Sequence, residues 1–207
     1  MTFEDEMNVL ESIEFDNSFV IKKGSVPILF SAPHTMEQIN NEGVLKYREY
    51  YTKAISLFLN KNYNTYSIVK LKDTGIDSNK DNYDQYNIEL KRLIKEENIK
   101  LVIDLHGASK ERKFDVEFGT LNNLTADFST IKELEESFIE NGVKNIKHND
   151  PFKGGAITQG LYKIKEIDVI QIEINGTFRD FQNINNLEKI VKSFAQFIEQ
   201  YKKYYTK

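Results

Sequence analysis

Four short runs rich in isoleucine and valine constrain the fold of this chain more than any other feature. They lie at residues 26–32, 65–71, 99–107 and 168–175, and polar residues or glycine bound each of them. Runs of this length and composition are typical of buried β-strands. Residues 114–120 form a further run, which we predict to be an extra strand.

Segments of helical periodicity separate these runs. Apolar residues recur three or four positions apart in segments 47–58, 83–94 and 131–138, and again in the C-terminal segment 187–201. Strands that alternate with helices favour an α/β fold, here a three-layer sandwich around a mixed, largely parallel central sheet. In such folds, ligands bind at the carboxyl edge of the sheet, where the strands end.

Size and composition indicate one folding unit. The chain has 207 residues, of which 40% are hydrophobic and 12% aromatic, enough to bury one substantial core. We find no repeat, low-complexity linker or change of composition that would mark a boundary. We therefore predict a single domain spanning residues 1–207.

The charge pattern argues against two classes of partner. The formal net charge is -4 and no basic block occurs, so nucleic acid is not an expected partner. The N-terminal stretch MTFEDEMNVLESIEF is acidic and lacks the basic start and apolar run of a signal peptide, and no later stretch is apolar for long enough to cross a bilayer. We expect a cytoplasmic protein without a membrane partner. The sequence indicates no oligomeric state.

The histidines suggest a metal site. The chain has no cysteine, so a metal would have to be held by His, Asp or Glu, and the only histidines are His34, His106 and His148. His34 follows the first predicted strand and His106 closes the most apolar one. Either histidine alone could simply bind a neighbouring loop. Together with Glu37, three residues after His34, they offer two imidazoles and a carboxylate, a set that zinc takes in catalytic sites.

At this point the order of motifs resembles that of the zinc carboxypeptidase superfamily, most closely its N-formylglutamate amidohydrolase-like branch. The motifs are His-x-x-Glu at residues 34–37, GIDSNKDN at 75–82, DLHG at 104–107 and QIEIN at 171–175, with SAPH at 31–34 and PFKGGAIT at 151–158 favouring the amidohydrolase branch. The resemblance implies a fold of the zinc carboxypeptidase or phosphorylase/hydrolase type. It also implies one zinc ion and a small amide or short peptide as substrate.

The carboxylate ligand of that zinc stays open between two residues. Glu37 has the literal carboxypeptidase spacing after His34. Glu49 corresponds by analogy to the acidic residue that the amidohydrolase branch takes from the start of the next helix, and Glu42 is a third, less favoured choice.

Glu173 lies within an otherwise apolar strand, where an ionised carboxylate needs compensation. Strand alternation alone would equally let Gln171, Glu173 and Asn175 face solvent. The resemblance implies that Glu173 is the general base, which takes a proton from zinc-activated water and passes it to the departing amine. The implied reaction is amide hydrolysis of a small N-acyl (formyl-like) amino acid or a related carboxylate-bearing amide, without a covalent intermediate.

Several supporting residues are also candidates. The resemblance implies that Asn79 and Lys80 hold the substrate's carboxylate, although Lys80 stands where an arginine would grip it with two prongs. Asp104 lies two strand positions before His106 and could orient it or neutralise the site. Further substrate-binding candidates are Arg112, although a member of such a Lys/Arg run is more often a solvated surface residue, and Lys153, Gly154 and Gly155, which could equally form a plain turn. His148 is interpreted as a loop histidine.

Two alternative functions differ in class from the amidohydrolase. One is a metallocarboxypeptidase that trims peptides or cell-wall fragments. The other is a non-catalytic ligand-binding relative that keeps the fold, which would bind no stoichiometric zinc.

Overall fold

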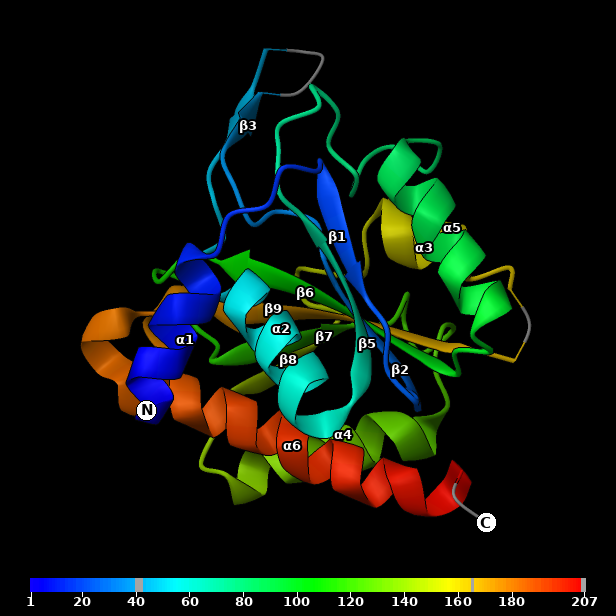
Figure 1. Ribbon diagram of the computed structural model, residues 1–207. Coiled ribbons are helices and arrows are strands. Elements are labelled where there is room, and N and C mark those ends of the chain that lie inside the picture. The colour runs from blue at the N-terminus through cyan, green and yellow to red at the C-terminus, as the bar shows by residue number, and fades with distance from the viewer. Residues whose placement is uncertain (40–42, 165, 206–207) are drawn as a thin grey trace.

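A computed structural model describes residues 1–39, 43–164 and 166–205, and within these residues seven strands form one sheet (Figure 1). Their order across the sheet is β1 (Phe19–Lys22), β5 (Thr65–Lys70), β2 (Val26–Ala32), β6 (Leu101–Ala108), β9 (Asp168–Asn175), β7 (Val116–Gly119) and β8 (Ile146–His148). The pairs β5·β2, β2·β6 and β6·β9 are parallel, whereas β1 and β7 run antiparallel to β5 and β9. The predicted mixed, largely parallel sheet is confirmed. A separate hairpin joins β3 (Gln38–Ile39) to β4 (Leu45–Lys46).

Helices cover both faces of the sheet and complete the predicted three layers (Figure 1). One face packs against α1 (Phe3–Ser12), α2 (Thr52–Tyr63), α4 (Phe128–Glu140) and α6 (Ile184–Tyr205). The other face packs against α3 (Gln85–Glu96) and α5 (Ala156–Leu161). Two short 3-10 helices, η1 (Gly176–Phe178) and η2 (Phe181–Asn183), connect β9 to α6. Among the described helices, none has both the length and the apolar character needed to span a bilayer.

One predicted helix begins later than its periodicity suggested. Residues 47–50 precede α2 as irregular chain, and α2 begins at Thr52 because Tyr51 adopts a left-handed conformation with φ of 64°. A residue in that conformation stands outside the helix. Helical spacing between Tyr47 and Tyr51 was therefore coincidental.

The central strands divide their two faces unequally. In β6, Leu101, Ile103 and Leu105 belong to the core under α2 and α6. On the opposite face, Val102 packs under α3 and α5, but Asp104 and His106 follow it. β9 repeats this pattern, with Val169 followed by Gln171 and Glu173. Side chains alternate along a strand, so one face of the sheet turns from apolar to polar toward its carboxyl edge. The polar and ionisable side chains of β6 and β9 lie together on that face.

Candidate active site and metal centre

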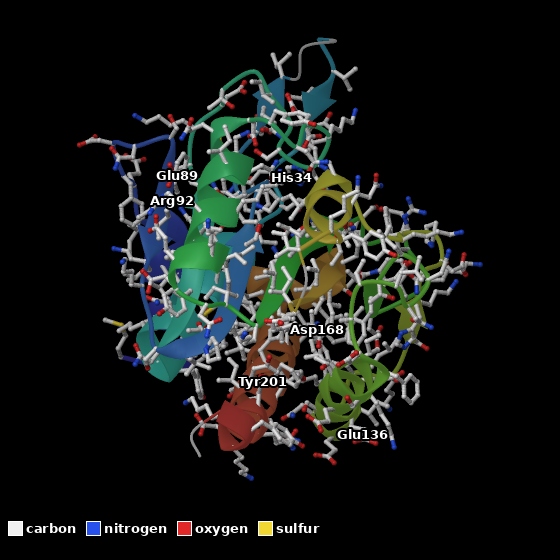
Figure 2. The ribbon with its side chains drawn as sticks, turned by 90° about the vertical axis from the view of Figure 1, so that its right-hand side faces the viewer. His34, Glu89, Arg92, Glu136, Asp168 and Tyr201 are labelled. Carbon is white, nitrogen blue, oxygen red and sulfur yellow. The ribbon has the colours of Figure 1, made fainter. Side chains whose placement is uncertain are left out.

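Two histidines and one glutamate meet at the carboxyl edge of the sheet. His34 Nδ1 lies 3.0 Å from His106 Nδ1, and the Glu49 carboxylate lies 3.1 Å from His34 Nδ1 and 3.4 Å from His106 Nδ1. All three residues are buried. In Figure 2, His34 lies toward the upper end of the sheet, opposite the end where Asp168 begins β9. This group of two nitrogens and one carboxylate fits the donor set of a catalytic zinc site.

The outward nitrogen of each histidine meets an aspartate. His34 Nε2 lies 2.7 Å from Asp77 Oδ1, and His106 Nε2 lies 3.0 Å from Asp104 Oδ2. A carboxylate beside one ring nitrogen keeps the proton there and directs the lone pair of the other nitrogen toward a metal. The residues present therefore fit a divalent ion bound through both Nδ1 atoms and Glu49.

These carboxylates are themselves held in place. Ser31 donates a hydrogen bond to Asp104 (2.9 Å), the Asn79 N–H donates to Asp77 (2.9 Å), and the Gly107 N–H donates to Glu49 (2.9 Å). Such bonds restrict the carboxylates to one orientation. The donor group is thus preorganised by residues that surround it.

The charges within this group shift the pKa values of His106 and Glu49 in opposite directions. Burial would lower the pKa of His106, but Asp104 and Glu49 raise that pKa well above its usual value. Burial would likewise raise the pKa of Glu49, yet His34 and His106 hold it well below its usual value. Without a metal, these two carboxylates favour the protonated form of His106.

This protonation predicts a pH-dependent metal affinity. A metal ion must displace the His106 proton, so the zinc association constant should rise as pH increases from 6 to 8, by about tenfold per unit if one proton is released. Chelator competition across this range measures the slope. A flat profile would show that binding releases no proton.

Glu173 lies beside this group on the neighbouring strand. It pairs in register with His106 across β6 and β9, and only 6% of it is exposed. Burial raises its pKa, the charge of Glu49 adds to this, and His106 partly offsets both. The Gln171 amide donates to its carboxylate at 2.8 Å. The sequence left open whether these strand residues are buried or face solvent. In the structure Gln171, Glu173 and Asn175 are all buried.

The structure distinguishes between the candidate carboxylates. Glu49 belongs to the group with His34 and His106, whereas Glu37 is exposed and, among the described residues, is not part of that group. Glu42 lies outside the described residues.

The other predicted residues are more dispersed. Lys80 is exposed and lines a cavity beside Glu49. Asn79 packs under Gly155, where an added Cβ would collide with the Asn79 amide, so its side chain supports the start of α5. Gly155 also donates its N–H to Gln171 (2.6 Å), which ties the Lys153–Gly155 segment to β9.

Two predicted residues lie elsewhere. Arg112 is exposed and stacks over the Phe152 ring, 5.0 Å from its centroid. His148, interpreted from the sequence as a loop histidine, is instead the last residue of β8 and pairs with Glu135 of α4 at 3.1 Å. Neither residue contributes to the group around Glu49.

The sequence alone did not single out Asp77 or Arg179. Asp77 follows the second apolar run, and β5 lies beside β2, so the order of strands would have placed it near His34. Arg179 donates to the carbonyls of Ile174, Tyr50 and Ala108 at 2.8–3.0 Å. A Cβ on Gly107 would collide with its guanidinium group, which explains the glycine after His106.

A cavity of about 480 Å³ opens on the carboxylate side of the group. Its lining includes four cationic side chains, Lys46, Arg48, Lys80 and Arg179, together with Glu49 and Asp77. Both carboxylates already contact histidine. Arg48 pairs with Glu11, and Lys46 lies 3.5 Å from Glu49. The excess of cationic over anionic side chains in the lining still favours an anionic ligand.

Comparisons with known proteins bear on the family and the fold of this chain. A family model for N-formylglutamate amidohydrolase matches residues 77–178. No curated protein matches the chain.

Solved structures show the same fold at low sequence identity. N-formylglutamate amidohydrolase from Ralstonia eutropha JMP134 is 12% identical, with a TM-score of 0.57, and the match covers 88% of this chain and 98% of that one. A bacteriophage poly-gamma-glutamate hydrolase is 12% identical with a TM-score of 0.57, covering 96% and 94%. Zinc-free YNDL is 19% identical with a TM-score of 0.56, covering 92% and 94%. The resemblance predicted from the sequence is confirmed: this chain is a hydrolase similar to the N-formylglutamate amidohydrolase family, with the family match carried by residues 77–178.

Proposed function

We propose that the chain, as one domain over residues 1–207, is a zinc-dependent amidohydrolase acting on a small N-acyl (formyl-like) amino acid or a related carboxylate-bearing amide. The observation that carries this proposal is the buried group of His34, Glu49 and His106 with Glu173 beside it in register. The family match over residues 77–178 supports the same reaction class.

The proposed chemistry assigns each residue a separate task. His34, Glu49 and His106 would hold one divalent ion, which supplies a Lewis acid that polarises the amide carbonyl and acidifies water. Glu173 accepts the proton that the attacking water loses and delivers it to the departing amine nitrogen. The raised pKa of Glu173 suits this task, because a carboxylate whose pKa is raised is a stronger base toward the attacking water.

The cationic cavity supports a substrate with a free carboxylate. Lys80 lies at the cavity wall and offers a point charge rather than the two-pronged contact of an arginine. Arg179 offers a planar guanidinium, but backbone carbonyls already engage it. We therefore propose Lys80, with Lys46, as the contacts for the substrate's carboxylate. In this proposal Asp104 orients His106 and the Asn79 N–H holds Asp77 in place. The Lys153–Gly155 segment and Arg112 lie outside the lining of this cavity.

The direct test combines metal content with hydrolysis. Protein purified without chelator should carry one zinc per chain and should hydrolyse members of a panel of N-formyl and N-acetyl amino acids. Carboxamide analogues, which lack the free carboxylate, serve as matched controls and should react more slowly. Removal of zinc should abolish turnover and its return should restore it. Absence of both stoichiometric zinc and hydrolysis would instead favour a non-catalytic ligand-binding protein.

A further inference from the structure

Helix α1 contacts the segment that delivers Glu49. The Glu11 carboxylate accepts a hydrogen bond from Arg48 Nη2 at 2.6 Å, and Arg48 also reaches the Glu11 carbonyl at 3.3 Å. The same carboxylate accepts the N–H groups of Tyr51 at 3.1 Å and Ala54 at 3.3 Å. Glu11 thus holds the chain on both sides of Glu49.

These contacts replace a local cap that α2 lacks. The first N–H groups of a helix have no partner within the helix, and a Ser, Thr, Asp or Asn at the N-cap normally accepts one of them. The N-cap of α2 is Tyr51, which makes no side-chain capping bond within the described part of the chain. Glu11 accepts from Tyr51 and from Ala54, the third helical residue, and so caps α2 from another helix.

Glu49 depends on such support because of where it lies in the sequence. Fourteen residues separate it from His34, and they include the β3–β4 hairpin. A ligand at the end of so long a connection has more conformational freedom to lose than one a few residues from its partner. Tyr51 also holds a left-handed conformation that is unfavourable for tyrosine, so surrounding contacts must maintain it.

The Glu49 backbone is itself bonded to its neighbours. The Glu49 N–H donates to the His34 carbonyl at 2.9 Å, and the Thr52 hydroxyl donates to the Glu49 carbonyl at 2.7 Å. These bonds fix the Glu49 backbone to β2 and α2, and the Glu11 contacts fix α2 and Arg48 to α1. The partly buried Arg48–Glu11 ion pair is screened less than an exposed one would be.

We propose that Glu11 is a positioning residue for the metal centre: α1 clamps the turn before α2, so that the Glu49 carboxylate is held beside His34 and His106 before a metal binds. Glu11 acts through Arg48, Tyr51 and Ala54 and does not itself touch the donor group. This inference rests on the metal site of the proposed function, and it gives α1, which precedes the segment matched by the family model, a role in that site.

Glu11→Gln and Glu11→Ala test the clamp. Gln keeps one acceptor oxygen but loses the charge opposite Arg48, whereas Ala removes every side-chain contact and leaves only the bond from Arg48 to the Glu11 carbonyl. We expect zinc affinity to fall about tenfold in Glu11→Gln and further in Glu11→Ala, since residues that orient a ligand typically change affinity by about 10–100-fold. Chelator competition on folded protein measures this, and the absorption spectrum of the cobalt-substituted protein reports whether the donor geometry has changed.

Glu6→Gln is the matched control. Glu6 pairs with Lys61 of α2 at 2.6 Å, so this variant likewise removes an ion pair made by α1, but one without contact to the turn before α2. Its zinc affinity and cobalt spectrum should equal those of the wild type. If Glu11→Ala fails to fold, Glu11→Gln decides. Wild-type affinity and spectrum in Glu11→Gln would overturn the clamp, whereas absence of zinc from the wild type would instead overturn the proposed function.

Discussion

Glu173→Gln is expected to abolish amide hydrolysis while the protein keeps its fold and its zinc. Glutamine cannot accept a proton, so the variant should lose about 10²–10⁴-fold in kcat, the range typical of a removed general base. The substitution is nearly isosteric, and the carbonyl oxygen of the introduced amide can still accept the bond that Gln171 now donates to Glu173. Hydrolysis of the N-formyl amino-acid panel, with zinc content measured on the same sample, separates the loss of chemistry from loss of metal.

The same substitution should stabilise the metal-free protein. Burial raises the pKa of Glu173 in the folded state, so ionising it costs more there than in the unfolded chain. This penalty is absent below the unfolded pKa, appears as pH rises toward the folded pKa, and is complete above it. In metal-free protein, the unfolding temperature of Glu173→Gln should therefore be higher than that of the wild type at neutral pH, and the difference should be smaller near pH 4. Glu37→Gln, an exposed exchange, is the control. Full turnover by Glu173→Gln would remove Glu173 from the mechanism.

The sequence predicted the centre of the sheet because those strands are covered on both faces. A strand segment under helices on both sides is continuous in Ile, Val and Leu, as at Leu101–Ile103 of β6 and Val169–Ile170 of β9. The edge strands β1 and β8 are short and only half-buried: β1 has just three consecutive apolar residues, Phe19–Ile21, and β8 has one. The sequence therefore identified the strands that carry His106 and Glu173 but not the full width of the sheet.

The parts of the site that the sequence missed depend on long-range pairing. Asp77 approaches His34 because β5 pairs with β2, a contact across 43 residues that no local pattern encodes. Arg179 turns back from η1 onto the Ala108 carbonyl at the end of β6. The carboxylate ligand stayed undecided for the same reason, since the β3–β4 hairpin determines which glutamate returns to His34.

Glu49→Gln should lose zinc, whereas Glu37→Gln should retain it. Glu49 is buried against both histidines and lies 3.5 Å from Lys46. Its negative charge therefore lies among groups that are positive or can become so. Glutamine keeps the shape but offers only a neutral amide oxygen, a weak zinc ligand. Removing residues that merely orient ligands costs about 10–100-fold in affinity, so loss of a ligand should cost at least about 100-fold. Zinc retained after dialysis against a chelator, followed by competition titration, measures both variants.

The two glutamates form a closely matched pair, because each follows His34 and each exchange removes one negative charge. An effect of net charge on zinc affinity would therefore appear in both variants. The two residues differ in burial, and an effect of ligation would appear only in Glu49→Gln. Glu49→Gln should also weaken the metal-free protein, since Glu49 accepts the Gly107 N–H and offsets the charge of His106. If Glu37→Gln lost zinc and Glu49→Gln kept it, the ligands would instead be His34 and Glu37, the close His-x-x-Glu pair. The hairpin would then have to refold around the metal to bring Glu37 inward.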